Sequence, residues 1–278
     1  LFAAYPEWYA SLFSGFYLAL LLILLALILR GVSFEYRHQR EGLQWKRGFD
    51  RMIVIGSAVP AFLWGVAVGN IVQGVPIDAD KNFTGTLFTL LNPYGLWVGV
   101  TTLLLFFLHG VYFVGLKTDG QVHHDAQALG KKLAIPTVVF AAGTVVWTIA
   151  IAAGREAPLL WAVIACGVIA AVALLASVVF NWVDRDGRAF AAGAVTIVFA
   201  VLTLWLALYP YVMPASNDPA NSLTIENASS TQMTLEIMSW AALVFLPLVL
   251  AYQAWTYWIF RKRITRAVIE EAEVAEVH

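Results

Sequence analysis

The chain has 278 residues, of which 60% are hydrophobic and only 13% charged, and its mean hydropathy is +0.76. These values leave too little polar surface for a soluble globular domain, so lipid must solvate much of the chain. The formal net charge of -1 gives no reason to expect a nucleic-acid partner.

Apolar stretches long enough to cross a bilayer recur along the chain. A spanning helix needs about 20 mostly apolar residues, because hydrocarbon offers no hydrogen-bond partner to the backbone. Seven stretches meet this length: 8–29, 52–73, 95–116, 133–153, 158–183, 189–213 and 237–260. The sequence therefore predicts an all-α, polytopic integral membrane bundle with seven visible spans, folded as a single transmembrane domain over residues 1–278.

Basic residues decide the expected orientation. Of the 17 Lys and Arg residues, all but Lys81 and Arg155 lie in segments on one side of the predicted membrane. The positive-inside rule places that side in the cytoplasm. We therefore expect a cytoplasmic C-terminus, with residues 267–278 as a solvated tail, and a visible N-terminus outside. The outer segments 74–94 and 214–236 are expected to be ordered loops or interfacial helices.

Ionisable groups inside spans are costly, so they are the first candidates for function. His109 is the one histidine well inside a predicted span, and we expect it to be a hydrogen-bonded interhelical residue, with haem ligation as the alternative. His123 and His124 precede a span and are expected in a solvated loop. Adjacent side chains on a helix diverge by about 100°, so they would fit one metal poorly, and no metal site is predicted. The lone Cys166 is expected to pack as a small hydrophobic residue.

Six further polar residues lie within or beside the spans: Glu35, Asp50, Asn70, Gln73, Glu236 and Gln253. The three carboxylates lie near predicted membrane surfaces, where an ordinary interfacial charge is the simplest interpretation. The three amides are expected to hydrogen-bond between helices, with contact to quinone or lipid as the alternative. No phosphate-binding loop or catalytic triad motif is found. The residues by themselves leave open a transporter or a subunit of a larger assembly.

Six strings resemble, in order and spacing, the cytochrome bd oxidase subunit II family. They are LFAAYPEWYASLFSGFYL at 1–18, WGVAVGNIVQGVP at 64–76, LLNPYGLWVGV at 90–100, LHGVYFVGLKTDG at 108–120, LYPYVMPAS at 208–216 and TLEIMSWAALVFLPLVLAYQAWTYWIFRKRI at 234–264. Family members resemble a nine-helix protein. The resemblance implies that this chain is N-terminally incomplete, without the first helix and most of the second.

The resemblance implies a place in the bacterial cell membrane and a heterodimer with subunit I, with small accessory subunits left open. Subunit I would carry the b-type haems, haem d and the quinol-oxidising loop, while this chain would bind no haem of its own. The implied reaction is oxidation of quinol on the outer side, coupled to reduction of oxygen to water with protons taken from the cytoplasm.

Two carboxylates fall in matching strings. Glu35 lies in SFEYRHQ, where relatives have a Phe-acid-Tyr-Arg run, and Asp50 lies in GFDRM, which matches a Trp-Asp string. The resemblance implies that both belong to a cytoplasmic proton-uptake path. It also weakens haem ligation by His109, because related sequences carry Gln there. A secondary transporter and a purely structural scaffold are the alternative functions.

Overall fold

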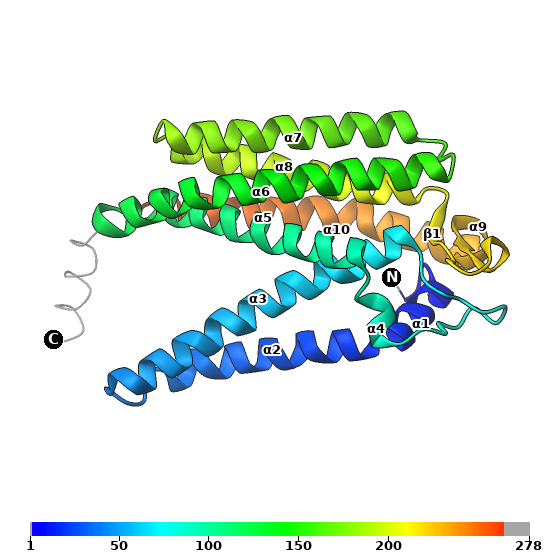
Figure 1. Ribbon diagram of the computed structural model, residues 1–278, viewed down its shortest axis with the longest axis horizontal. Helices are drawn as coiled ribbons and strands as arrows, with labels where there is room; N and C mark the ends of the chain where they lie inside the picture. Colours follow the sequence, from blue (N-terminus) through cyan, green and yellow to red (C-terminus); the bar gives the residue numbers. More distant parts are fainter. Residues whose placement is uncertain (1, 264–278) are drawn as a thin grey trace.

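Residues 2–263 are described in the computed structural model, and seven helices among them are long and apolar enough to cross a membrane (Figure 1). They are α2 (Tyr17–Tyr36), α3 (Leu43–Gln73), α5 (Pro93–Lys117), α6 (Gly120–Gly154), α7 (Leu160–Trp182), α8 (Asp186–Leu208) and α10 (Gln232–Ile259). Between them lie the short elements α1 (Pro6–Gly15), α4 (Leu87–Leu90), β1 (Tyr211–Met213), η1 (Pro219–Asn221), β2 (Leu223–Thr224) and α9 (Ile225–Ala228). The predicted membrane bundle is confirmed, with one small antiparallel β1–β2 ribbon added. The predicted tail 267–278 lies outside the described residues.

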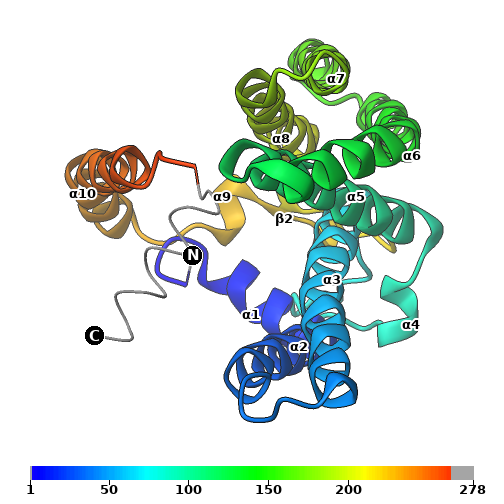
Figure 2. The same ribbon diagram turned by 90° about the vertical axis from the view of Figure 1, so that its left-hand side faces the viewer.

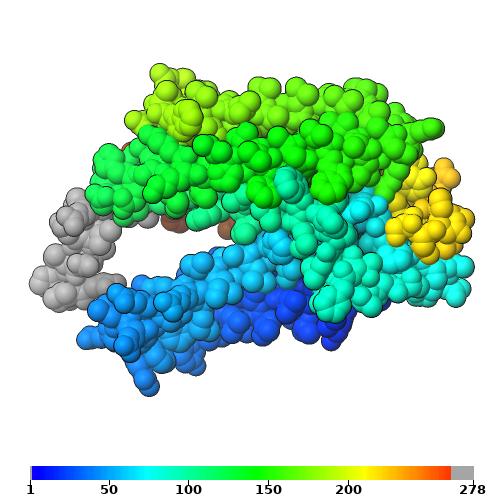
Figure 3. Space-filling model, in the orientation of Figure 1, coloured from blue at the N-terminus to red at the C-terminus, as the bar shows by residue number. Residues whose placement is uncertain are grey.

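The spanning helices form two packed bodies and one separate helix. Helices α5 to α8 make a four-helix bundle, and the α2–α3 hairpin joins it through α3 and α5. Figure 3 shows the hairpin diverging from the bundle toward the end that carries segments 37–42, 118–119 and 183–185, called the basic end below. Segments 74–92, 155–159 and 209–231 lie at the opposite end, called the loop end. Helix α10 stands apart and has no buried residue (Figure 2).

The prediction of a first span over 8–29 was wrong at its start. Residues Pro6–Gly15 form the separate helix α1, and α2 begins only after it. The chain turns at Phe16, whose side chain is buried, and the Phe83 ring packs directly against the backbone of Gly15. A Cβ at Gly15 would come within 2.5 Å of that ring. This contact between segments far apart in the sequence holds the break between α1 and α2 in place.

Other predicted limits also moved. The spans predicted at 52–73 and 133–153 were too short, because α3 and α6 continue as polar helical turns beyond the apolar stretch at the basic end. The span predicted at 189–213 was too long at its end. Pro210 cannot continue a helix, and the next residues pair as strand β1 with β2.

The two long segments at the loop end pack on each other. The Ile77 backbone N–H donates to the Asn217 side chain at 3.0 Å, and the Asn217 amide donates back to the Ile77 carbonyl at 2.8 Å. Asn221 donates to the same carbonyl at 3.1 Å. Side-chain amides therefore satisfy backbone groups that no regular element pairs, and both segments, 74–94 and 214–236, are ordered as expected.

A glycine seam lets α3 and α5 approach closely. Gly65 and Gly69 on α3 face Gly95 and Gly99 on α5, each pair being spaced four residues apart. A Cβ at Gly65 would overlap the Thr102 hydroxyl and come within 2.8 Å of the Gly99 Cα. Small residues at this spacing let helix backbones touch, which supplies the dispersion contacts that hold helices together in lipid.

Substitution at this seam should separate the hairpin from the bundle. We expect Gly65→Ala to lower the free energy of unfolding by about 1–3 kcal/mol, because the added methyl has backbone on its far side and overpacks the contact. Thermal unfolding of the purified protein in detergent, followed by size-exclusion chromatography, measures this loss.

Gly48→Ala is the matched control on the same helix. Nothing lies within 4 Å of a Cβ at Gly48, so this variant should unfold at or above the wild-type temperature. Equal losses for the two variants would contradict the close-packing role of the seam.

Candidate functional site

The pair formed by Arg37 and Asp50 joins α2 and α3 at the basic end. The Arg37 Nε donates to the Asp50 carboxylate at 2.6 Å. Both side chains are well exposed, at 33% and 48%, so water screens their attraction. The hydrogen bond to Asp50 raises the pKa of the Arg37 guanidinium above its ordinary value. Asp50 is thus a charged, water-accessible carboxylate held in a defined place.

Glu35 lies on the last turn of α2, exposed at the same end of the molecule. Among the described residues it forms no hydrogen bond or ion pair. The structure therefore brings Glu35 and Asp50 to one end of the hairpin but does not join them in one hydrogen-bond network.

A buried carboxylate at the basic end was missed by sequence reasoning. Asp186 is the first residue of α8 and is 8% exposed. One of its oxygens accepts from the Gln127 amide at 3.2 Å, and the other accepts from Arg263 at 3.1 Å. The string VDRDGR resembles a solvated loop, so nothing in the local sequence separates Asp186 from the exposed Asp184. Only the placement of an acid at a helix N-terminus was a usable signal.

His123 belongs to the same cluster, and its predicted position in a solvated loop was wrong. It lies near the start of α6, where its Nδ1 is 2.8 Å from the Gly115 carbonyl and 3.8 Å from the Asp186 carboxylate. His124, next along the helix, is exposed. The reason is tertiary: the turn between α5 and α6 is so short that the first turn of α6 folds back against the end of α5.

Buried polar residues continue from this cluster into the bundle. Asn181 and Ser177 lie one helical turn apart on α7, 3% and 0% exposed. The Tyr112 hydroxyl and the His109 Nδ1, both on α5, are buried and have no hydrogen-bond partner among the described residues. An unpartnered buried polar group costs about 1–3 kcal/mol, so such atoms are usually bound to ordered water.

His109 does not form the interhelical hydrogen bond that the sequence predicted. Its ring stacks on Phe190 of α8, with ring centroids 4.5 Å apart. Its Nδ1 faces Gly193, where a Cβ would come within 2.9 Å of it. Helix α8 thus closes the Nδ1 side of the imidazole ring.

Asn70 is a structural residue with every polar atom of its side chain occupied. Its amide donates to the Val66 carbonyl at 2.8 Å and to the Leu90 carbonyl at 2.7 Å. Its oxygen accepts from the Asn92 amide at 2.6 Å. The predicted hydrogen bonding between segments is confirmed for this residue, and no free group is left for a ligand.

Gln73 has a different environment at the end of α3. Its side-chain oxygen is buried without a partner in the described part of the chain. Its main-chain carbonyl accepts from Arg155, which also donates to the Val72 carbonyl at 2.6 Å. Burial lowers the pKa of the Arg155 guanidinium, which here caps a helix C-terminus, where a cation is favourable.

The two candidates on α10 are exposed. Glu236 accepts from Gln232 one turn earlier at 2.9 Å, and Gln253 lies beside Lys117 and Phe113 of α5 at the basic end. Within residues 2–263 no three His, Cys, Asp or Glu side chains are grouped so as to hold a metal ion. Cys166 is half-buried in α7.

Comparison with known proteins agrees with the strings quoted above. Residues 1–260 match the family described as cytochrome bd terminal oxidase subunit II. Cytochrome bd-I ubiquinol oxidase subunit 2 of Escherichia coli K12 is 36% identical over 97% of this chain and 80% of its own length. Cytochrome bd ubiquinol oxidase subunit 2 of Bacillus subtilis 168 is 35% identical over 95% of this chain and 78% of its own length.

A probable cytochrome oxidase subunit 2 of Haemophilus influenzae is 33% identical over 92% of this chain and 76% of its own length. The match to the family covers all seven long apolar helices from end to end. The chain therefore belongs to the cytochrome bd terminal oxidase subunit II family.

Proposed function

We propose that this chain is the haem-free second subunit of a quinol:oxygen oxidoreductase and that a partner, subunit I, carries haem b, haem d and the quinol site. The match to the subunit II family over residues 1–260 carries this proposal. It favours the oxidase over the transporter and the scaffold.

The basic end of the molecule faces the cytoplasm of a bacterial cell in this proposal. Among residues 2–263, all Lys and Arg residues except Lys81 and Arg155 lie in the segments at this end or on the parts of the chain that adjoin it. Lys81 is paired with Glu7, and Arg155 donates to carbonyls at the C-terminus of α3, so neither is a free positive charge. The positive-inside rule then gives a cytoplasmic C-terminus and a multi-pass chain.

Glu35 and Asp50 form the entrance of a proton path at this cytoplasmic end. Reduction of oxygen to water consumes protons, and a reaction centre within the bilayer needs ionisable groups to bring them from the aqueous phase. Asp50 is held charged beside Arg37, and Glu35 is open to water. The competing interpretation is that Asp50 only ties α2 to α3, a role that needs the ion pair but no proton exchange.

Haem content tests whether all haems of the complex are bound by subunit I. The complex purified through this chain should contain a haem-bearing partner, and His109→Ala should leave its reduced-minus-oxidised spectrum unchanged, because no iron is bound there. Loss of one b-type haem band from an intact complex would overturn the haem-free assignment.

Impermeant thiol labelling tests the orientation. After Cys166→Ala, cysteine placed at exposed position Glu41 or His124 should resist the reagent in intact cells, because both lie at the basic end. Cysteine at Asp80 or Asp218, at the loop end, should react. Strong labelling at position 41 before lysis would reverse the proposed topology.

Turnover tests the proton entry. Glu35→Gln and Asp50→Asn should assemble with normal haem content but oxidise quinol severalfold more slowly, most severely at alkaline pH where protons are scarce. Stopped-flow or oxygen-electrode rates across pH 6 to about pH 9 would measure this.

Glu41→Gln is the matched control, since it removes an exposed carboxylate from the same loop without touching either candidate. Arg37→Gln separates the structural role, because it breaks the ion pair and keeps the acid. If both acid variants turn over like Glu41→Gln at every pH, the relay is wrong and the carboxylates are structural.

A further inference from the structure

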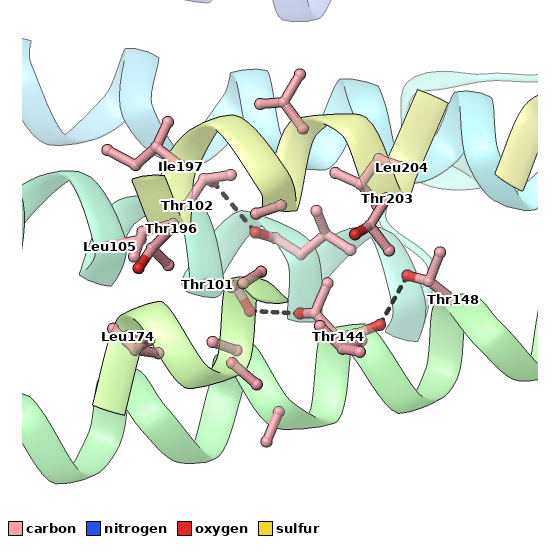
Figure 4. A pocket seen from close by; sticks show the side chains of 18 of the residues that line it. Thr101, Thr102, Leu105, Thr144, Thr148, Leu174, Thr196, Ile197, Thr203 and Leu204 are labelled. Carbon is pink, nitrogen blue, oxygen red and sulfur yellow. Dashed lines mark hydrogen bonds between the residues drawn. The ribbon is translucent and has the colours of Figure 1, made fainter. Parts of the chain in front are cut away.

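A cavity of about 170 Å³ lies inside the α5–α8 bundle (Figure 4). Side chains from all four helices line it, among them Leu105 of α5, Thr144 of α6, Leu174 of α7 and Thr196 of α8. These four are buried, with exposed fractions of 8% or less. The cavity is distinct from the carboxylates at the basic end, because it lies between the apolar middle stretches of the helices.

The lining is apolar although it contains several threonines. Each buried hydroxyl is already used by a carbonyl four residues earlier on its own helix. The donor–acceptor pairs are Thr101 to Trp97, Thr144 to Phe140, Thr148 to Thr144, Thr196 to Ala192 and Thr203 to Phe199, at 2.7 to 3.0 Å. A water molecule needs two to four polar partners to enter a buried site. With these hydroxyl hydrogens already donated and little polar surface left on its walls, the cavity favours an apolar occupant.

Size and access restrict that occupant further. Apolar cavities of about 150 Å³ in proteins stay dry and bind xenon or benzene. Phe106, Leu175 and Val201 line the cavity and are also 45%, 52% and 44% exposed on the outside of the bundle. The cavity is thus partly open to the outer surface of the bundle, and small uncharged molecules can reach it from there.

We propose that this cavity is a binding site for uncharged molecules of the size of dioxygen, and that it takes up dioxygen from the hydrocarbon for the oxidase. The assignment to dioxygen rests on the proposed function, since that reaction consumes it. Dioxygen dissolves better in hydrocarbon than in water, so a dry cavity at membrane depth collects it where it is most concentrated. The site itself follows from volume, lining and access alone.

Xenon tests the site without reference to activity. Crystals of the purified complex pressurised with xenon should show an anomalous peak bounded by Leu105, Leu174 and Thr196. Ala170→Leu should remove the peak, because Ala170 lines the cavity and is 3% exposed, leaving the new side chain nowhere else to go. Val168→Leu, on the exposed face of the same helix, should keep it. If Ala170→Leu does not assemble, Ala200→Leu fills the cavity from α8.

Oxygen kinetics test the ligand. Ala170→Leu should raise the KM for dioxygen while kcat and haem content stay at the level of Val168→Leu. Absence of the xenon peak, or an elongated lipid chain in its place, would overturn the site. A xenon peak with an unchanged KM would overturn the assignment to dioxygen. A xenon peak in a complex that lacks haem and oxidase activity would contradict the proposed function and leave the site standing.

Discussion

The close approach of helix backbones is the constraint on which this fold depends. In lipid, helices gain little by burying apolar side chains on each other, so contact distance and satisfied polar atoms decide which helices associate. The glycines that face each other on α3 and α5 provide that contact and join the hairpin to the bundle. Arg155 then satisfies the carbonyls left open at the loop end of α3, and Asn70 satisfies the Leu90 carbonyl of α4.

The polar groups at the basic end differ from those in the middle of the bundle in how they are paired. At the basic end, carboxylates are exposed or charge-paired, as Asp50 is with Arg37, and Asp186 is buried but accepts two hydrogen bonds. Further in, threonine hydroxyls bond to their own helices, so the middle of the bundle is polar in composition but apolar in surface. This division agrees with the proposed proton entry at the surface and the proposed gas site in the interior.

Helix α10 is left uncovered by the rest of the described chain. None of its residues is buried, yet it is tied to the rest at both ends: Lys117 donates to the Phe260 carbonyl, and the Ser230 N–H donates to the Ala4 carbonyl. A helix that is apolar around its whole circumference requires lipid or another protein on every face. This is the surface expected of a subunit that works within a larger membrane assembly.

The sequence by itself determined the class and the seven spans, because hydrocarbon imposes a fixed length and hydropathy on any helix that crosses it. It determined the family through six strings of residues that match in order and spacing. It also located Glu35 and Asp50 at one membrane surface through the distribution of basic residues. Only the tertiary structure decided that α1 separates from α2 and that His123 meets Asp186. It also decided that His109 stacks on Phe190 and that side chains from four helices line one apolar cavity. These features depend on contacts between residues far apart in the chain, and neither local hydropathy nor spacing encodes such contacts.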